Sequence, residues 1–98
     1  MARISSFSET NIKAWGTLDE FQVWLLRLLH AWKEPPSADQ LFSAVLQSFG
    51  PYDRQKFEYY LQEICGDLKP VHENFRGGEK IYVLTSSGLA YLIKHDLI

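Results

Sequence analysis

Three consecutive polar residues, Arg54, Gln55 and Lys56, could do chemistry on a nucleic acid. An arginine guanidinium can donate two hydrogen bonds to guanine O6 and N7, and a glutamine amide can pair with adenine N6 and N7. A lysine ammonium suits a phosphate oxygen. If a helix presents these side chains outward, they predict contact with duplex DNA. The alternative is an ordinary solvated face, which charged residues on an exposed helix usually form.

A second group of basic residues flanks a pair of glycines. Lys69, Arg76 and Lys80 lie around Gly77 and Gly78. Glycines permit the positive φ of a tight hairpin turn, and an arginine at such a tip could enter a minor groove. The alternative is a plain hairpin turn that needs glycine only for its geometry.

Acidic and aromatic neighbours complicate the DNA hypothesis. Glu58 and Glu63 follow the first basic group, and Glu73 and Glu79 dilute the second. Tyr59 can hydrogen-bond a phosphate or anchor a protein partner. It can equally be a half-buried amphipathic ring, so the sequence leaves its role open.

No residue pattern predicts catalysis, a metal site or a cofactor. His30, His72 and His95 are far apart in the sequence, without metal-ligand spacing. The single cysteine, Cys65, cannot form an intramolecular disulfide, and its place beside Ile64 is typical of a buried small apolar residue. We expect a protein that is not an enzyme and needs no cofactor.

Composition predicts one packed domain without a strong basic excess. The chain has 98 residues, of which 46% are hydrophobic and 14% aromatic, which argues against disorder. Ten Lys and Arg stand against twelve Asp and Glu, so DNA binding depends on local placement of charge. No apolar run approaches the ~20 residues of a membrane span, and no signal-peptide pattern is present. We therefore expect no membrane association and a cytoplasmic location.

Three segments with helical apolar spacing predict three helices, over residues 17–34, 37–50 and 53–65. The first two start with a capping-box pattern, and Asp53 can cap the third. The capping pairs are Thr17 with Glu20 and Ser37 with Gln40. The inward faces of the second and final helices include Leu46, Phe49 and Ile93. The predicted core consists of Trp24, Leu25, Leu28, Leu41, Val45, Phe57, Leu61, Ile64, Val83 and Leu92.

After Gly66 the apolar period changes from helical to alternating. Residues 69–84 predict a β-hairpin, and Thr85 or Ser86 can cap a final helix. The predicted order is helix, helix, sharp turn, helix, hairpin, helix. The segment YVLTSSGLAYL resembles the end of the wing in PadR-like and MarR-like repressors, where a strand runs into Leu-Thr-x-x-Gly, here Leu84, Thr85 and Gly88.

This resemblance covers roughly residues 17–98 and implies a winged helix-turn-helix domain, in the α+β class and mainly helical. It implies a small transcriptional regulator that reads double-stranded DNA with helix 53–65 and wing 69–84, usually as a homodimer. The alternative is a winged-helix protein–protein interaction module without DNA binding, including a phage-type accessory or inhibitor protein. The acidic balance favours this alternative. DNA binding is favoured by the residues expected on the groove side, which are Arg54, Gln55, Lys56, Arg76 and Lys80.

Residues 1–16 are predicted to form an N-terminal arm with Phe7, Ile12 and Trp15 among polar residues. Leu97 and Ile98 add apolar surface at the other end of the chain. One domain of this size has little room to bury both groups, which predicts a homodimer through the arm and the final helix.

Overall fold

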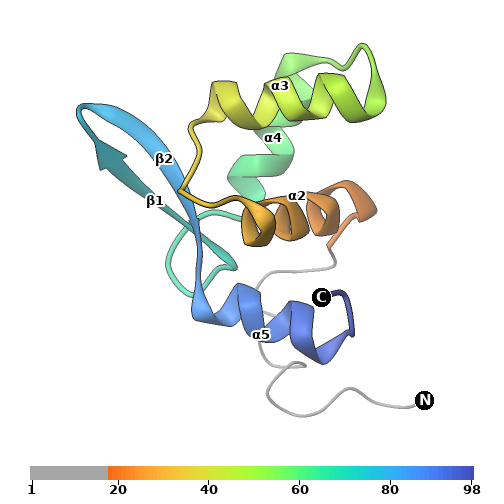
Figure 1. The fold of residues 1–98 in the computed structure, drawn as a ribbon, viewed down its shortest axis with the longest axis vertical. Coiled ribbons are helices and arrows are strands. Elements are labelled where there is room, and N and C mark those ends of the chain that lie inside the picture. Colours follow the sequence, from red (N-terminus) through yellow and green to blue (C-terminus); the bar gives the residue numbers. More distant parts are fainter. Residues whose placement is uncertain (1–17) are drawn as a thin grey trace.

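The computed structural model describes residues 18–98, which form four helices and a two-stranded antiparallel sheet. Helices α2, α3 and α4 pack together, the hairpin extends to one side, and α5 lies beneath α2 (Figure 1). The predicted fold class, α+β and mainly helical with a hairpin before the last helix, is confirmed. The elements are α2 (Glu20–Ala31), α3 (Ala38–Phe49), α4 (Arg54–Glu63), β1 (Val71–Arg76), β2 (Glu79–Leu84) and α5 (Ser86–Lys94).

Helix α2 begins after Asp19, so the predicted capping box at Thr17 and Glu20 is wrong. The Asp19 carboxylate accepts a hydrogen bond from the amide of Phe21 at 2.9 Å, and the Gln22 side chain accepts one from the amide of Asp19 at 2.9 Å. Asp-x-x-Gln satisfies the same reciprocal pattern two residues later. Thr17 lies outside the described residues.

The next two helices begin where the sequence predicts. The amide of Gln40 donates to Ser37 Oγ at 3.3 Å, and the amide of Ser37 donates to Gln40 Oε1 at 2.9 Å. The Asp53 carboxylate accepts from the amide of Lys56 at 3.3 Å. Gly50, at φ +79°, ends α3 in a conformation that favours glycine. Gly50 and Asp53 therefore fix the end of α3 and the start of α4, which are separated by a short turn.

The core lies between the three helices, the base of the hairpin and α5. Of the predicted core residues, Leu25, Leu41, Val45, Phe57, Leu61, Ile64 and Leu92 are buried. Trp24 and Leu28 are only partly buried and pack against the core from its edge. Val83 is also only partly buried, although Ile81, on the same face of β2, and the neighbouring Tyr82 are both buried.

Three apolar side chains that were predicted to face inward are exposed. Leu46 and Phe49 in α3 are 40% and 48% exposed, and Ile93 in α5 is 61% exposed. Helical periodicity identifies the apolar positions but not how wide a stripe the neighbouring elements cover. The C-terminal half of α3 therefore keeps apolar surface in contact with solvent.

A two-residue turn joins the strands of the hairpin, as predicted. Gly77 and Gly78 have φ values of +59° and +84°, which suit the positive-φ turn that matches the twist of paired strands. Arg76 pairs with Glu79, and the ladder continues to Val71 and Leu84.

Thr85 and Gly88 fasten the base of the hairpin to α5. The amide of Thr85 donates to the carbonyl oxygen of Pro70 at 2.9 Å, and the hydroxyl lies 3.0 Å from the carbonyl oxygens of Lys69 and Pro70. The same hydroxyl accepts from the amide of Gly88 at 3.0 Å. Gly88 is buried against the Pro70 carbonyl, where an added Cβ would collide with that oxygen. The Leu-Thr-x-x-Gly pattern thus has a structural role.

Candidate interaction surface

The outward face of α4 is polar and uncharged at its centre. Phe57 and Leu61 point into the core, while Gln55, Tyr59 and Gln62 are exposed on the opposite side. A helix turns about 100° per residue, which puts positions 54 and 56 roughly 160° apart on opposite flanks of this face. The two predicted cations of α4 therefore do not form one basic cluster.

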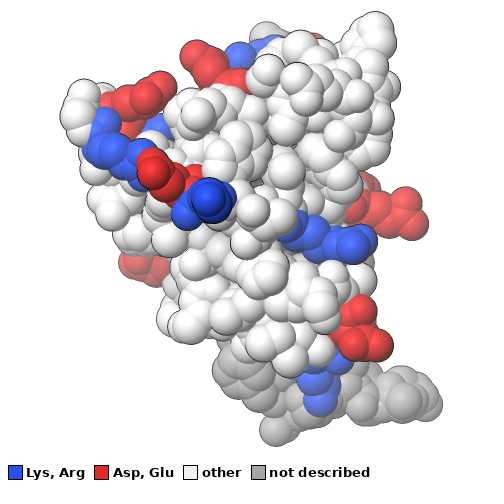
Figure 2. All heavy atoms as spheres, in the orientation of Figure 1, with Lys and Arg blue, Asp and Glu red and all other residues white. Residues whose placement is uncertain are grey.

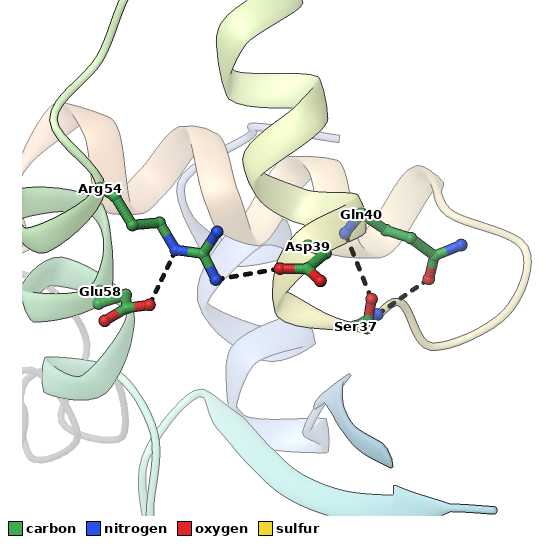
Figure 3. A network of polar contacts seen from close by, with 5 residues as sticks. All are labelled: Ser37, Asp39, Gln40, Arg54 and Glu58. Atoms are coloured by element: carbon green, nitrogen blue, oxygen red, sulfur yellow. Dashed lines mark hydrogen bonds and ion pairs between the residues drawn. The ribbon is translucent and has the colours of Figure 1, made fainter.

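Arg54 is held by two carboxylates (Figure 3). Its Nε donates to Glu58 Oε2 at 2.8 Å, and its Nη2 donates to Asp39 Oδ1 at 3.1 Å. The guanidinium also lies 5.0 Å from the centre of the Phe42 ring. The hydrogen bonds that Arg54 donates to Glu58 and, second, to Asp39 raise the pKa of Arg54. A base or phosphate would have to compete with both carboxylates for the same donors.

Lys56 and Gln55 have no carboxylate partner among residues 18–98. The Lys56 ammonium lies 5.8 Å and 5.9 Å from the ring centres of Tyr52 and Tyr60, at the outer limit of a cation–π contact. Gln55 is exposed. These two residues are the part of α4 best placed to meet a nucleic acid.

Tyr59 is the largest exposed side chain of α4, with 61% of its surface in contact with solvent. Its hydroxyl hydrogen-bonds the Glu63 carboxylate, which raises the pKa of the phenol. Tyr60 is half-buried beside it, at 5.9 Å between ring centres. Of the two tyrosines, it is Tyr59 that is exposed to solvent on the outer side of α4.

The α4 face continues onto β1 through a polar contact. Gln62 donates from its amide nitrogen to Glu73 Oε2 at 3.1 Å. Lys80 on β2 lies 3.6 Å from the other oxygen of Glu73. Glu73 thus bridges the helix and the hairpin, and it offsets the charge of Lys80.

The other two basic residues of the wing point elsewhere. Arg76 contacts Glu34 at 3.3 Å and the carbonyl oxygen of Pro35 at 3.4 Å, both in the connection between α2 and α3. Because successive strand residues point to opposite faces, Arg76 and Lys80 lie on different faces of the hairpin. The Lys69 ammonium donates to the carbonyl oxygen of Glu63 at 3.0 Å.

Positive and negative side chains therefore alternate across this region instead of separating into one basic surface. Figure 2 shows blue and red atoms interspersed around the hairpin and the start of α3, with a broad uncharged area over the other end of α3. The α4–wing face consists of Arg54, Gln55, Lys56, Tyr59, Gln62, Glu73 and Lys80. Around its uncharged centre, Arg54 and Lys80 are paired with carboxylates, whereas Lys56 is not.

The sequence does not reveal that the carboxylates of Asp39 and Glu34 are partners of Arg54 and Arg76. The Arg54–Glu58 pair has i, i+4 spacing, which is a readable signal on any helix. Asp39 and Glu34 lie 15 and 42 residues from their arginines, so only the fold brings them together.

Metal binding and nucleophilic chemistry find no support in the described part of the chain. Residues 18–98 contain no group of three His, Cys, Asp or Glu side chains placed to hold a metal ion. Burial raises the pKa of the Cys65 thiol to about 12, which disfavours a reactive thiolate.

None of the helices among residues 18–98 is long and apolar enough to cross a membrane.

The order of helices and hairpin is compatible with a winged-helix layout. No family model matches the chain. The search of curated proteins and the search of solved structures also find no significant match. The resemblance to PadR-like and MarR-like repressors therefore depends on the element order and on the Leu-Thr-x-x-Gly pattern alone.

Proposed function

We propose that the protein is a winged-helix module that binds another protein through the α4–wing face. The supporting observation is the exposed Tyr59 between Gln55 and Gln62, an uncharged row along the outer side of α4. The centres of protein interfaces are depleted in charged residues, and tyrosine is enriched among the side chains that dominate binding energy.

The charges around this row support the same proposal. Arg54, Arg76 and Lys80 each lie within 4.0 Å of a carboxylate oxygen. Exposed ion pairs contribute only about 0–1 kcal/mol, so each cation could turn away from its partner. The carboxylates would nevertheless stay within the ~8–10 Å screening length of any bound phosphate and repel it. Tight DNA binding normally needs uncompensated cations that release counterions.

A DNA-binding transcriptional regulator is the second candidate. The observation that favours it is the position of Gln55 and Lys56 in the first turn of α4, without carboxylate partners in the described part of the chain. In a winged helix this end of the third helix approaches the bases.

The homodimer remains a prediction. Its N-terminal arm, residues 1–16, lies outside the described residues. At the other end of the chain, Ile93 and Ile98 are 61% and 49% exposed, which leaves apolar surface that a second copy could cover. A dimer is compatible with either candidate function.

Photocrosslinking in the cells that express the protein distinguishes the two candidates. We expect a photoreactive phenylalanine at position 59 to become crosslinked to another protein. Protease should digest this adduct, whereas nuclease, which would digest crosslinked DNA, should leave it intact. The same residue at Gln47, an exposed position on α3, is the matched control and should give a much weaker adduct. A nuclease-sensitive adduct at position 59, or equal protein adducts at both positions, would contradict the proposal.

A further inference from the structure

An open groove of about 440 Å³ lies between the part of α2 that runs from its cap, Asp19, to Arg27 and the end of α3. Aromatic rings line its middle: Trp24 from α2, Phe49 at the end of α3, and Tyr52 in the following turn. Nearly half of the Phe49 surface is exposed, at 48%. The groove does not include the outward face of α4, so what it binds is independent of the function proposed above.

Ring-to-ring contacts hold these side chains in place. Trp24 and Phe49 meet edge to face at 4.9 Å between ring centres, with an interplanar angle of 71°. Tyr52 stacks on the buried Phe21 at 4.8 Å and 13°. The rings are fixed by their neighbours before any ligand arrives, so binding costs little side-chain ordering.

Acidic and basic residues line different parts of the groove, with Asp19 and Glu20 at the start of α2 and Arg27 about two turns further along it. Glu20 and Arg27 both line it, and neither forms an ion pair with another described residue. They are seven residues apart on α2, which corresponds to about 10 Å along the helix axis. An extended polyproline II segment rises about 3.1 Å per residue, so three residue steps span the same length.

We infer that this groove binds an extended proline-containing peptide, with a basic residue beside Glu20 and an acidic residue beside Arg27. Aromatic-lined grooves suit polyproline segments, because these are already extended and lose little entropy on binding. The two groove charges select partners whose charges have the opposite signs and the matching spacing.

The test is an NMR titration of the full-length chain with the peptide acetyl-Arg-Pro-Pro-Glu-amide. We expect saturable shifts of the Trp24 indole and of the amides of Glu20, Phe49 and Tyr52, with small changes along α4. Phe49→Ala should weaken binding about tenfold, as loss of a central aromatic contact does. Because Phe49 is half exposed, the spectrum of this variant should remain that of a folded protein.

Charge variants provide the specificity control. Glu20→Arg should shift the preference toward acetyl-Glu-Pro-Pro-Glu-amide, and Arg27→Glu toward acetyl-Arg-Pro-Pro-Arg-amide, each by about two- to fivefold. Equal responses to all three peptides, or shifts confined to α4, would overturn the inference. So would groove shifts that follow protein concentration without peptide, because a second copy would then be the occupant.

Discussion

Leu61→Ala is expected to lower the free energy of unfolding by about 2–5 kcal/mol. Leu61 is 1% exposed and lies on the inward face of α4, next to Phe57 and Ile64 in the core. Removing its buried methyl groups loses their transfer free energy and leaves a cavity. Since small domains are stable by only about 5–15 kcal/mol, the loss is a large part of the total.

Urea unfolding followed by tryptophan fluorescence measures this change, with Gln55→Ala as the control on the same helix. Gln55 is exposed, so its replacement should alter the free energy of unfolding by no more than about 0.5 kcal/mol. If Leu61→Ala also changed it by less than about 0.5 kcal/mol, the orientation of α4 described above would be wrong.

Gly88→Ala is expected to destabilise the protein by about 1–3 kcal/mol, the usual cost of overpacking. In an exposed helix the same substitution would stabilise by up to about 1 kcal/mol, because alanine has the higher helix propensity. Here the new methyl group would collide with the Pro70 carbonyl oxygen and approach Leu84 Cδ1 to 2.7 Å. The steric term therefore decides the sign.

Thermal unfolding of Gly88→Ala beside Ser86→Ala isolates this contact. Ser86 lies in the same first turn of α5 but is exposed, so its variant reports the effect of alanine without the collision. A higher melting temperature for Gly88→Ala than for the wild type would show that α5 does not pack against Pro70 in this way.

Local signals predicted the elements well, and tertiary contacts explain the differences. The Ser37 cap, the Gly77-Gly78 turn and the Thr85 cap depend on residues within three positions of one another, so the sequence contains all of their information. The exposure of Phe49 and Ile93 could not be predicted, because it depends on which neighbouring elements cover each helix.

The candidate site also combines local features, which the sequence predicts, with contacts that only the folded chain brings together. Arg54, Gln55 and Lys56 were correctly assigned to the start of a helix after Asp53, and the Glu58 partner of Arg54 is local. Composition shows that acidic residues outnumber basic ones, but it does not show where on the surface the acidic residues lie. The pairing of Arg54 with Asp39 joins two helices and required the folded chain, and this placement changes the favoured function from DNA binding to protein binding.

A fluorescence anisotropy titration of a random-sequence DNA duplex tests the central claim most directly. The wild type is compared at low and physiological salt with a triple variant, Asp39→Asn, Glu58→Gln and Glu73→Gln, which removes the carboxylates beside Arg54 and Lys80. We expect no saturable binding by the wild type even at low salt. The variant should bind with an affinity that falls as salt rises, because its cations are then uncompensated. Salt-sensitive binding by the wild type, with no gain in the variant, would contradict the account.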